Sequence, residues 1–339
     1  MMLQPRSSRT LAFLASLVVG LGLIASPASA QYKITNLVSN QTGKAKHVDA
    51  DLVNAWGMSF FSGGPFWISD EGSGLSTFYS GKGVKVGTVT IPGSTPTGQV
   101  ANGTSDFVVT EGNNSGPALF IFDTFEPGEI SGWNPSVDPN NAIAVVKGTG
   151  AWFTGLAIGQ NGGANFIYAV DNLNNKVDIY DGSFTLTKSF TDTNLTGLKA
   201  YNALVINGQL YVIFADAANT KGAVDIFDTA GNFVKTLTKD KHLKGPWGIA
   251  VAPKNFGKAS NDLLVSDLGD GHINAFNAKT GKFVTQLKGT NKKVLSIDGL
   301  WAIAFGEGGG QNGKSNQLFF TAGPNGYANG LFGMITAAK

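Results

Sequence analysis

Four short segments near the carboxyl end decide the fold: Trp247-Gly-Ile-Ala-Val251, Asp262-Leu-Leu-Val-Ser-Asp267, His272-Ile-Asn-Ala-Phe276 and Lys282-Phe-Val-Thr-Gln-Leu287. They are rich in apolar, β-branched and aromatic residues, and Gly, Asn and Asp stand between them, which is typical of strands joined by tight turns. The same order of four segments recurs along the chain. Four strands per repeat are typical of a β-propeller blade, so the repeat predicts that fold.

Three other repeats align with this one over all four strands and begin at Trp56, Thr154 and Asn202. Another, between Gly98 and Val146, is less regular, and we expect its first strand to be an interrupted segment over 98–109. The last repeat, from Leu300 to Ile335, has only three strands.

The strand missing from the last repeat is available at the other end of the chain. Tyr32-Lys-Ile-Thr-Asn-Leu-Val38 precedes the first repeat and belongs to none. Pairing it with the last repeat would close the ring and remove exposed sheet edges. The sequence therefore predicts an all-β, six-bladed propeller, one domain over 31–339, with its N-terminal strand closing the last blade.

The first thirty residues predict a cleavable signal peptide. Arg6 and Arg9 precede an apolar stretch, and Ser26-Pro-Ala-Ser-Ala30 ends it with the small residues of a cleavage site. The apolar stretch is shorter than a membrane-spanning helix requires. We expect a secreted or periplasmic protein that begins at Gln31 and has no membrane span after cleavage.

Charge and composition narrow the classes of partner. The 25 basic residues include Arg6 and Arg9, so the mature chain would carry 23 lysines against 23 acidic residues and no arginine. A neutral chain without arginine lacks the bidentate groups that read phosphates and guanine edges, so nucleic acid is not an expected partner. There is no cysteine, and burial rather than disulfides must stabilise the fold. We expect a monomer.

The repeat also predicts where a site would lie. In a propeller the first strand of each blade lines the central channel and begins on the face where the second strand ends. Acids end the second strand in five repeats, and polar residues stand near the start of several first strands. The candidate ligand or ion face therefore comprises Asn54, Asp70, Asp171, Asn202, Asp216, Asp267 and Asp298, with Asp123 as the fifth second-strand acid.

Two interpretations of these acids stay open. A ring of carboxylates and amides at the channel mouth could hold Ca²⁺, which takes six to eight oxygen ligands and could polarise an ester or lactone carbonyl. Alternatively, each Asp accepts hydrogen bonds from its own turn, as Asp267-Leu-Gly-Asp-Gly271 suggests. The second interpretation is simpler, because a repeated turn explains a repeated position.

Other motifs add little chemistry. Gly308 to Ser315 matches the P-loop pattern, but a strand rather than a helix follows, so we expect a hairpin loop. His47, His242 and His272 lie in different repeats and are expected at the surface. Trp56 and Trp247, like Trp301, recur at blade starts; we expect packing between neighbouring blades, with a sugar-stacking platform as the alternative.

Several strings resemble a family of uncharacterised bacterial exported six-bladed propellers, related in fold to the NHL and TolB-like groups, some of whose members carry a PEP-CTERM tail. The resembling strings are Asp51-Leu-Val-Asn-Ala-Trp-Gly57, Gly74-Leu-Ser-Thr-Phe-Tyr79, Ile130-Ser-Gly-Trp-Asn-Pro135, Asp298-Gly-Leu-Trp-Ala-Ile-Ala-Phe-Gly306, Phe320-Thr-Ala-Gly-Pro324 and Gly330-Leu-Phe-Gly333. The resemblance implies the fold and export, and it implies no activity. The sequence ends without a sorting tail, which favours a soluble product.

Two functions follow as hypotheses. The first is a non-enzymatic binding or scaffold module without a cofactor, whose channel mouth holds a small molecule, a glycan or a protein. The second is a Ca²⁺-dependent hydrolase, such as a lactonase, that uses the acids and amides of the mouth; it rests on analogy of fold.

Overall fold

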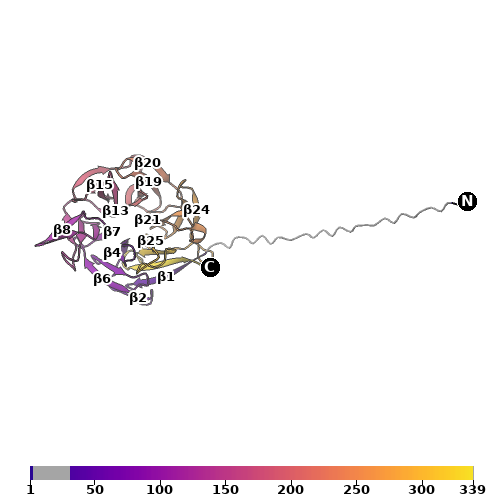
Figure 1. The fold of residues 1–339 in the computed structure, drawn as a ribbon, viewed down its shortest axis with the longest axis horizontal. Helices are drawn as coiled ribbons and strands as arrows, with labels where there is room; N and C mark the ends of the chain where they lie inside the picture. The colour runs from indigo at the N-terminus through magenta and orange to yellow at the C-terminus, as the bar shows by residue number, and fades with distance from the viewer. Residues whose placement is uncertain (3–30, 339) are drawn as a thin grey trace.

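The computed structural model describes residues 1–2 and 31–338, and in this part of the chain six β-sheets surround one axis (Figure 1). The predicted signal peptide lies almost wholly outside the described residues. The one described helix is the single 3₁₀ turn η1 (Gly257–Ala259), so none of residues 31–338 forms a helix that could cross a membrane. The prediction of an all-β six-bladed propeller is confirmed.

Four blades consist of four antiparallel strands in chain order from the axis outward. Blade one contains β3 (Ala55–Ser59), β4 (Phe66–Asp70), β5 (Leu75–Tyr79) and β6 (Lys85–Thr90). Blade three contains β13 (Phe153–Asn161), β14 (Ala164–Asp171), β15 (Lys176–Asp181) and β16 (Leu186–Phe190). Blade four contains β17 (Lys199–Ile206), β18 (Gln209–Ala215), β19 (Gly222–Asp228) and β20 (Phe233–Thr238). Blade five contains β21 (Pro246–Val251), β22 (Asp262–Asp267), β23 (Ile273–Asn277) and β24 (Phe283–Gln286).

Blade two corrects the expected first strand. Its sheet contains β7 (Pro96–Ala101), β10 (Phe120–Thr124), β11 (Ile130–Trp133) and β12 (Ile143–Val146). The residues after β7 leave the sheet and form a separate hairpin of β8 (Val108–Glu111) and β9 (Asn114–Pro117), which Figure 1 shows at the rim. The expected strand over 98–109 was therefore wrong: a two-stranded insertion follows a short inner strand.

Blade six contains the predicted closure. It is built from β25 (Leu300–Phe305), β26 (Gln317–Ala322) and β27 (Leu331–Ala337), followed outward by β1 (Tyr32–Ser39) and the short β2 (His47–Val48). Strand β1 runs antiparallel to β27, with Tyr32 opposite Ala337 and Ser39 opposite Leu331. The Tyr32 hydroxyl donates to the Phe256 carbonyl at 2.9 Å, which ties this closing strand to blade five as well.

The first strands meet around the axis and set the width of the channel. Each contacts the first strand of the next blade, and β25 contacts β3, so the ring is closed. Small residues allow this approach: a Cβ atom on Gly57 would lie 2.2 Å from the carbonyl oxygen of Thr97, and one on Gly98 would lie 2.3 Å from the amide nitrogen of Leu156. Apolar side chains fill the spaces between blades and form the core.

Candidate functional site

The strand register places only three of the five second-strand acids at equivalent positions. In blades one, three and five, a second-strand residue pairs with a polar third-strand residue: Ile68 with Thr77, Ala169 with Asp178, and Val265 with Asn274. The acid stands two residues after each of these second-strand residues, at Asp70, Asp171 and Asp267. In blade four the register puts Phe214 there, and Asp216 lies two residues further, because the turn is longer. In blade two the register puts Thr124 there, one residue after Asp123. The expectation of one acid position repeated in five blades was therefore wrong.

The three equivalent acids are fully buried and hydrogen-bonded inside their own blades. An oxygen of Asp70 accepts from the Thr77 amide at 3.0 Å and from its hydroxyl at 2.7 Å. An oxygen of Asp267 accepts from the Asn274 amide group at 2.7 Å. Burial raises the pKa of both Asp70 and Asp267 well above the usual range, and these hydrogen bonds only partly oppose it.

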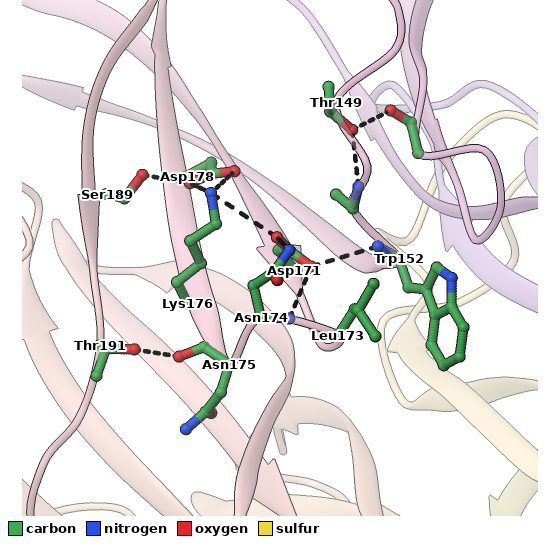
Figure 2. A network of polar contacts seen from close by, with 12 residues as sticks. Thr149, Trp152, Asp171, Leu173, Asn174, Asn175, Lys176, Asp178, Ser189 and Thr191 are labelled. Atoms are coloured by element: carbon green, nitrogen blue, oxygen red, sulfur yellow. Dashed lines mark hydrogen bonds and ion pairs between the residues drawn. The ribbon is translucent and has the colours of Figure 1, made fainter.

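Asp171 has the fullest set of partners (Figure 2). It accepts from the Trp152 and Asn174 amides at 3.3 and 3.2 Å, and from the Asn174 side chain at 2.6 Å. Lys176 lies between two carboxylates: its Nζ is 3.8 Å from Asp171 and 2.9 Å from both oxygens of Asp178. These contacts join β14, β15 and the connection before β13. The partners of the Asp171 carboxylate therefore all belong to blade three and the connection that leads into it.

The two remaining second-strand acids also face local partners. Asp123 is fully buried and accepts from the Thr97 hydroxyl at 2.8 Å and the Gly98 amide at 2.5 Å, within blade two. Burial raises the pKa of Asp123 to about 7, against the effect of these two hydrogen bonds. Asp216 is half-buried and accepts from the Thr220 and Lys221 amides at 2.7 and 2.8 Å. Burial acts to raise the pKa of Asp216, but its hydrogen bonds together outweigh burial and lower that pKa.

The two asparagines proposed for the ligand face hold tryptophans instead. The Asn54 side-chain oxygen accepts from the indole nitrogen of Trp301 at 3.0 Å, and its amide group donates to Glu71 at 2.8 Å. The Asn202 amide group donates to the carbonyl oxygen of Trp247 at 2.9 Å. Both asparagines are buried. Asp298 is exposed and accepts from the Asn325 amide at 2.8 Å.

A tryptophan cluster consists of Trp56, Trp247 and Trp301. It closes the channel on the face where the second strands end in their acids, which we call the acid face. The rings of Trp56 and Trp301 stack with centroids 3.9 Å apart, and the Trp247 ring meets the Trp301 ring edge-on at 5.9 Å. The Trp247 indole donates to the Thr154 carbonyl at 2.9 Å, from blade five to blade three. The expected packing between neighbouring blades is present, and it also blocks the expected mouth.

Further aromatic side chains extend from this cluster to the protein surface on the acid face. Phe125 lies 6.3 Å from Trp56, and Trp152 lies 5.0 Å from Phe125, measured between ring centroids. Tyr327 lies 5.7 Å from Trp301 and is exposed. An aromatic surface therefore stands where the sequence predicted a polar mouth.

The open part of the channel is an apolar cavity at the opposite face, where the first strands end. We call it the axial funnel; its volume is about 400 Å³. All six first strands line it, and its floor includes Trp247, Gly57 and Gly98. Its apolar wall includes Met58, Phe60, Leu156, Leu204, Ile249 and Ile303. Each first strand pairs only on its outer side, so its inner edge also presents backbone polar groups to the channel.

Asn202, one of the predicted site residues, lines the funnel and has a partner near its floor, as does Gln99, whereas the hydroxyl of Ser59 in the lining has none among the described residues. The Gln99 amide group donates to the carbonyl oxygens of Gly57 and Trp67 at 3.0 and 2.6 Å. The exposed Glu307 lines the funnel and is its charged residue. The funnel therefore suits an apolar molecule that makes few hydrogen bonds.

The geometry gives no assembled metal centre at the predicted mouth. Within residues 31–338, no group of three or more His, Asp and Glu side chains is placed to hold a metal ion. His242 and His272 pair with Asp240 and Asp270 at 2.6 and 3.0 Å, in separate loops. The segment that matches the P-loop pattern lies between strands β25 and β26. It is a hairpin loop followed by a strand, as expected.

Sequence reasoning missed the funnel because it located the site by polar residues. The available signal was the apolar end of the first strands, for example Ile249 to Val251 and Ile303 to Phe305. These residues follow the tryptophans along the same strands. One short sequence segment therefore contains both the tryptophan that closes one end of the channel and the apolar residues that line its open end.

Solved structures support the class of protein that this geometry defines. Over 91% of the chain, the fold matches a streptogramin B lyase structure (TM-score 0.55, 10% identity, 98% of that chain). Over the same share it matches a catalytically inactive virginiamycin B lyase from Staphylococcus aureus with quinupristin (TM-score 0.53, 11% identity, 99% of that chain). At such identities the match concerns the fold alone. The protein is a six-bladed β-propeller.

The family is shown by sequence. The chain is 31% identical over 331 residues to uncharacterized protein R648 of Acanthamoeba polyphaga mimivirus, covering 90% of this chain and 80% of the relative. It is 27% identical over 335 residues to uncharacterized protein L690 of the same virus, covering 91% and 86%. No protein-family model matches. The chain belongs to the family that includes R648; because these relatives are viral, membership in a bacterial exported family stays a prediction.

Proposed function

We propose that this propeller is an exported, non-catalytic binding module whose axial funnel takes a small, largely apolar ligand. The observation that carries the proposal is the funnel itself: a cavity of about 400 Å³, closed at one end by the tryptophan cluster and lined by apolar side chains from all six blades. Ligand pockets are commonly concave, apolar and of several hundred Å³, with a few polar groups that orient the ligand.

The ligand class follows from the lining. Apolar side chains favour a hydrocarbon or aromatic body, and burial of such a body is favourable at about 25 cal/mol per Å². Backbone groups at the inner edges of the first strands, apart from the Gly57, Thr154 and Trp247 carbonyls that already accept hydrogen bonds, can bind one or two polar atoms. A neutral aromatic amine, such as N-phenyl-1-naphthylamine, has this chemistry and serves as a fluorescent probe.

Filling the funnel should abolish probe binding. Ala304 lines the funnel on β25, and Ala304→Trp places a large side chain in the space that the probe needs. We expect the affinity for the naphthylamine, measured by fluorescence titration, to fall at least about tenfold, which corresponds to about 1.4 kcal/mol. Ala164→Trp is the matched control, because Ala164 is exposed at the start of β14 and does not line the funnel.

A second variant separates the funnel from the aromatic surface of the acid face. Trp152→Ala removes a partly exposed ring of that surface and should leave probe binding unchanged. If Trp152→Ala abolishes binding while Ala304→Trp retains it, the ligand site is the aromatic surface and the proposal is wrong.

Export rests on the predicted signal peptide. When the full chain is expressed in a bacterium with an intact secretion pathway, we expect the mature N-terminus to be Gln31 by mass spectrometry. Ala30→Arg removes the small residue at the cleavage position and should leave the precursor unprocessed. A cytoplasmic, full-length product of the unaltered chain would contradict export.

A further inference from the structure

Blade four contains a buried carboxylate that lacks the partners of its counterparts. Asp225 on β19 is fully buried, and neither of its carboxylate oxygens has a hydrogen-bond partner of normal geometry among the described residues; the nearby donor is the hydroxyl of Thr236, which pairs with it across the strands. The Oδ2 atom of Asp192, in the connection between blades three and four, is also buried without a partner in the same part of the chain. These two carboxyl groups lie near enough to share a hydrogen bond. A buried charge without partners is strongly unfavourable.

The equivalent residue in blade three shows what is missing. Strand register makes Asp178 the counterpart of Asp225, because Asp178 pairs with Ala169 and Asp225 with Val212 at the same place in each blade. In blade three Lys176 places its ammonium group 2.9 Å from both Asp178 oxygens (Figure 2). Two residues before Asp225 stands Ala223 instead, so blade four keeps the carboxylate and lacks its cation.

The nearest groups of blade four do not replace that lysine. Lys239, beyond the end of β20, forms no ion pair with either carboxylate among the described residues. Burial, followed by the Asp192 carboxyl, raises the pKa of Asp225 to about 8, and Thr236 and Lys239 oppose this only in part. One shared proton would supply a partner to two of the three free oxygens and leave the third without one.

We propose that Asp192 and Asp225 bind a metal cation of the oxygen-preferring class, best represented by Ca²⁺, which takes the place that Lys176 fills in blade three. The cation would coordinate all three free carboxylate oxygens, and backbone carbonyls or water would supply the remaining ligands. It would join the connection between blades three and four to the middle of blade four. This site is distinct from the second-strand acids of the expected ion face: buried Asp70, Asp123 and Asp267 each have one oxygen without a partner, but the other oxygen accepts a hydrogen bond within its own blade, whereas Asp225 has neither oxygen so paired.

The test is a thermal unfolding series on chelator-treated protein with and without about 5 mM CaCl₂, a concentration suited to extracellular calcium sites. We expect calcium to raise the Tm of the unaltered protein by roughly 5 °C or more, because it binds only the folded state. Asp225→Asn and Asp192→Asn should each lose this shift. Calorimetric titration with CaCl₂ should give one site in the unaltered protein and none in either variant.

The stability of Asp225→Asn in chelator distinguishes loss of the metal site from misfolding of the variant. In chelator, Asp225→Asn should be at least as stable as the unaltered protein, because it removes a buried carboxylate that has no partner; with calcium the order should reverse. Asp216→Asn is the control: Asp216 lies in the same blade with its own hydrogen bonds, and the calcium shift should remain.

Three results would overturn the proposal. One is the absence of any calcium shift in the unaltered protein, with a Tm that depends only on pH through Asp225, which would indicate a shared proton. The second is an equal shift in Asp225→Asn. The third is loss of the shift in Asp216→Asn, which would place the ion at the acid face.

Discussion

Replacing Gly57 by alanine is expected to destabilise the protein by about 3 kcal/mol, since overpacking of a close contact costs one to three kcal/mol or somewhat more. The added Cβ would lie 2.2 Å from the carbonyl oxygen of Thr97 and 3.3 Å from the Cα atom of Gly98. Both are backbone atoms of β7 in the next blade, so neither can rotate away. The first strands of blades one and two would have to separate.

Gly103→Ala is the matched control for this prediction. A Cβ on Gly103 meets no atom within 4 Å, and its backbone is not in the left-handed region. The free energy of unfolding, measured by denaturant titration, should therefore change by less than about 0.5 kcal/mol in the control. Equal effects of the two substitutions would contradict the close packing of first strands around the axis.

The second large effect is a loss of stability between mildly acidic and mildly alkaline pH. Burial raises the pKa of Asp123 to about 7, and it raises those of Asp70 and Asp267 well above the usual range. A carboxyl whose pKa is higher in the folded than in the unfolded state binds more protons when folded, so its contribution is present at low pH and is lost as pH rises. For Asp123 alone, we expect the free energy of unfolding to fall by roughly 2 to 3 kcal/mol between about pH 5 and pH 8.

The acids with lowered pKa values act in a different window. In Asp216 and Asp228 burial is outweighed by several hydrogen bonds, which lower the pKa of each, so their contributions are lost only below about pH 4. Asp123→Asn preserves an acceptor for Thr97 and Gly98, and it should flatten the dependence of Tm on pH between about pH 5 and pH 8. An unchanged slope in this variant, or a protein that gains stability toward the alkaline end, would contradict the buried state of Asp123.

The blades and their closure were predictable from sequence, because they depend on a repeat that each segment carries. The pairing of Tyr32 to Ser39 with β27 follows from a count of strands. Blade two was harder, since Val108 and Val109 have the composition of a strand whether they continue β7 or begin a hairpin. Only the sheet pairing distinguishes the two.

The site was less predictable, because it depends on register and on contacts around the axis. Asp216 resembles Asp171 as the acid at the end of a second strand, yet a longer turn moves it two residues beyond the equivalent position. The Trp247 indole reaches a carbonyl group of blade three, a contact between residues far apart in the sequence. No repeat alignment indicates that this contact closes one end of the channel and leaves the other end open.

A crystal structure of the protein soaked with a brominated naphthalene derivative tests the central claim most directly, because anomalous scattering locates the bromine without prior assumptions. We predict a bromine site inside the axial funnel, between Ile249 of β21 and Ile303 of β25. An occupied site over Trp152 on the acid face, with the funnel free of the compound, would contradict the account.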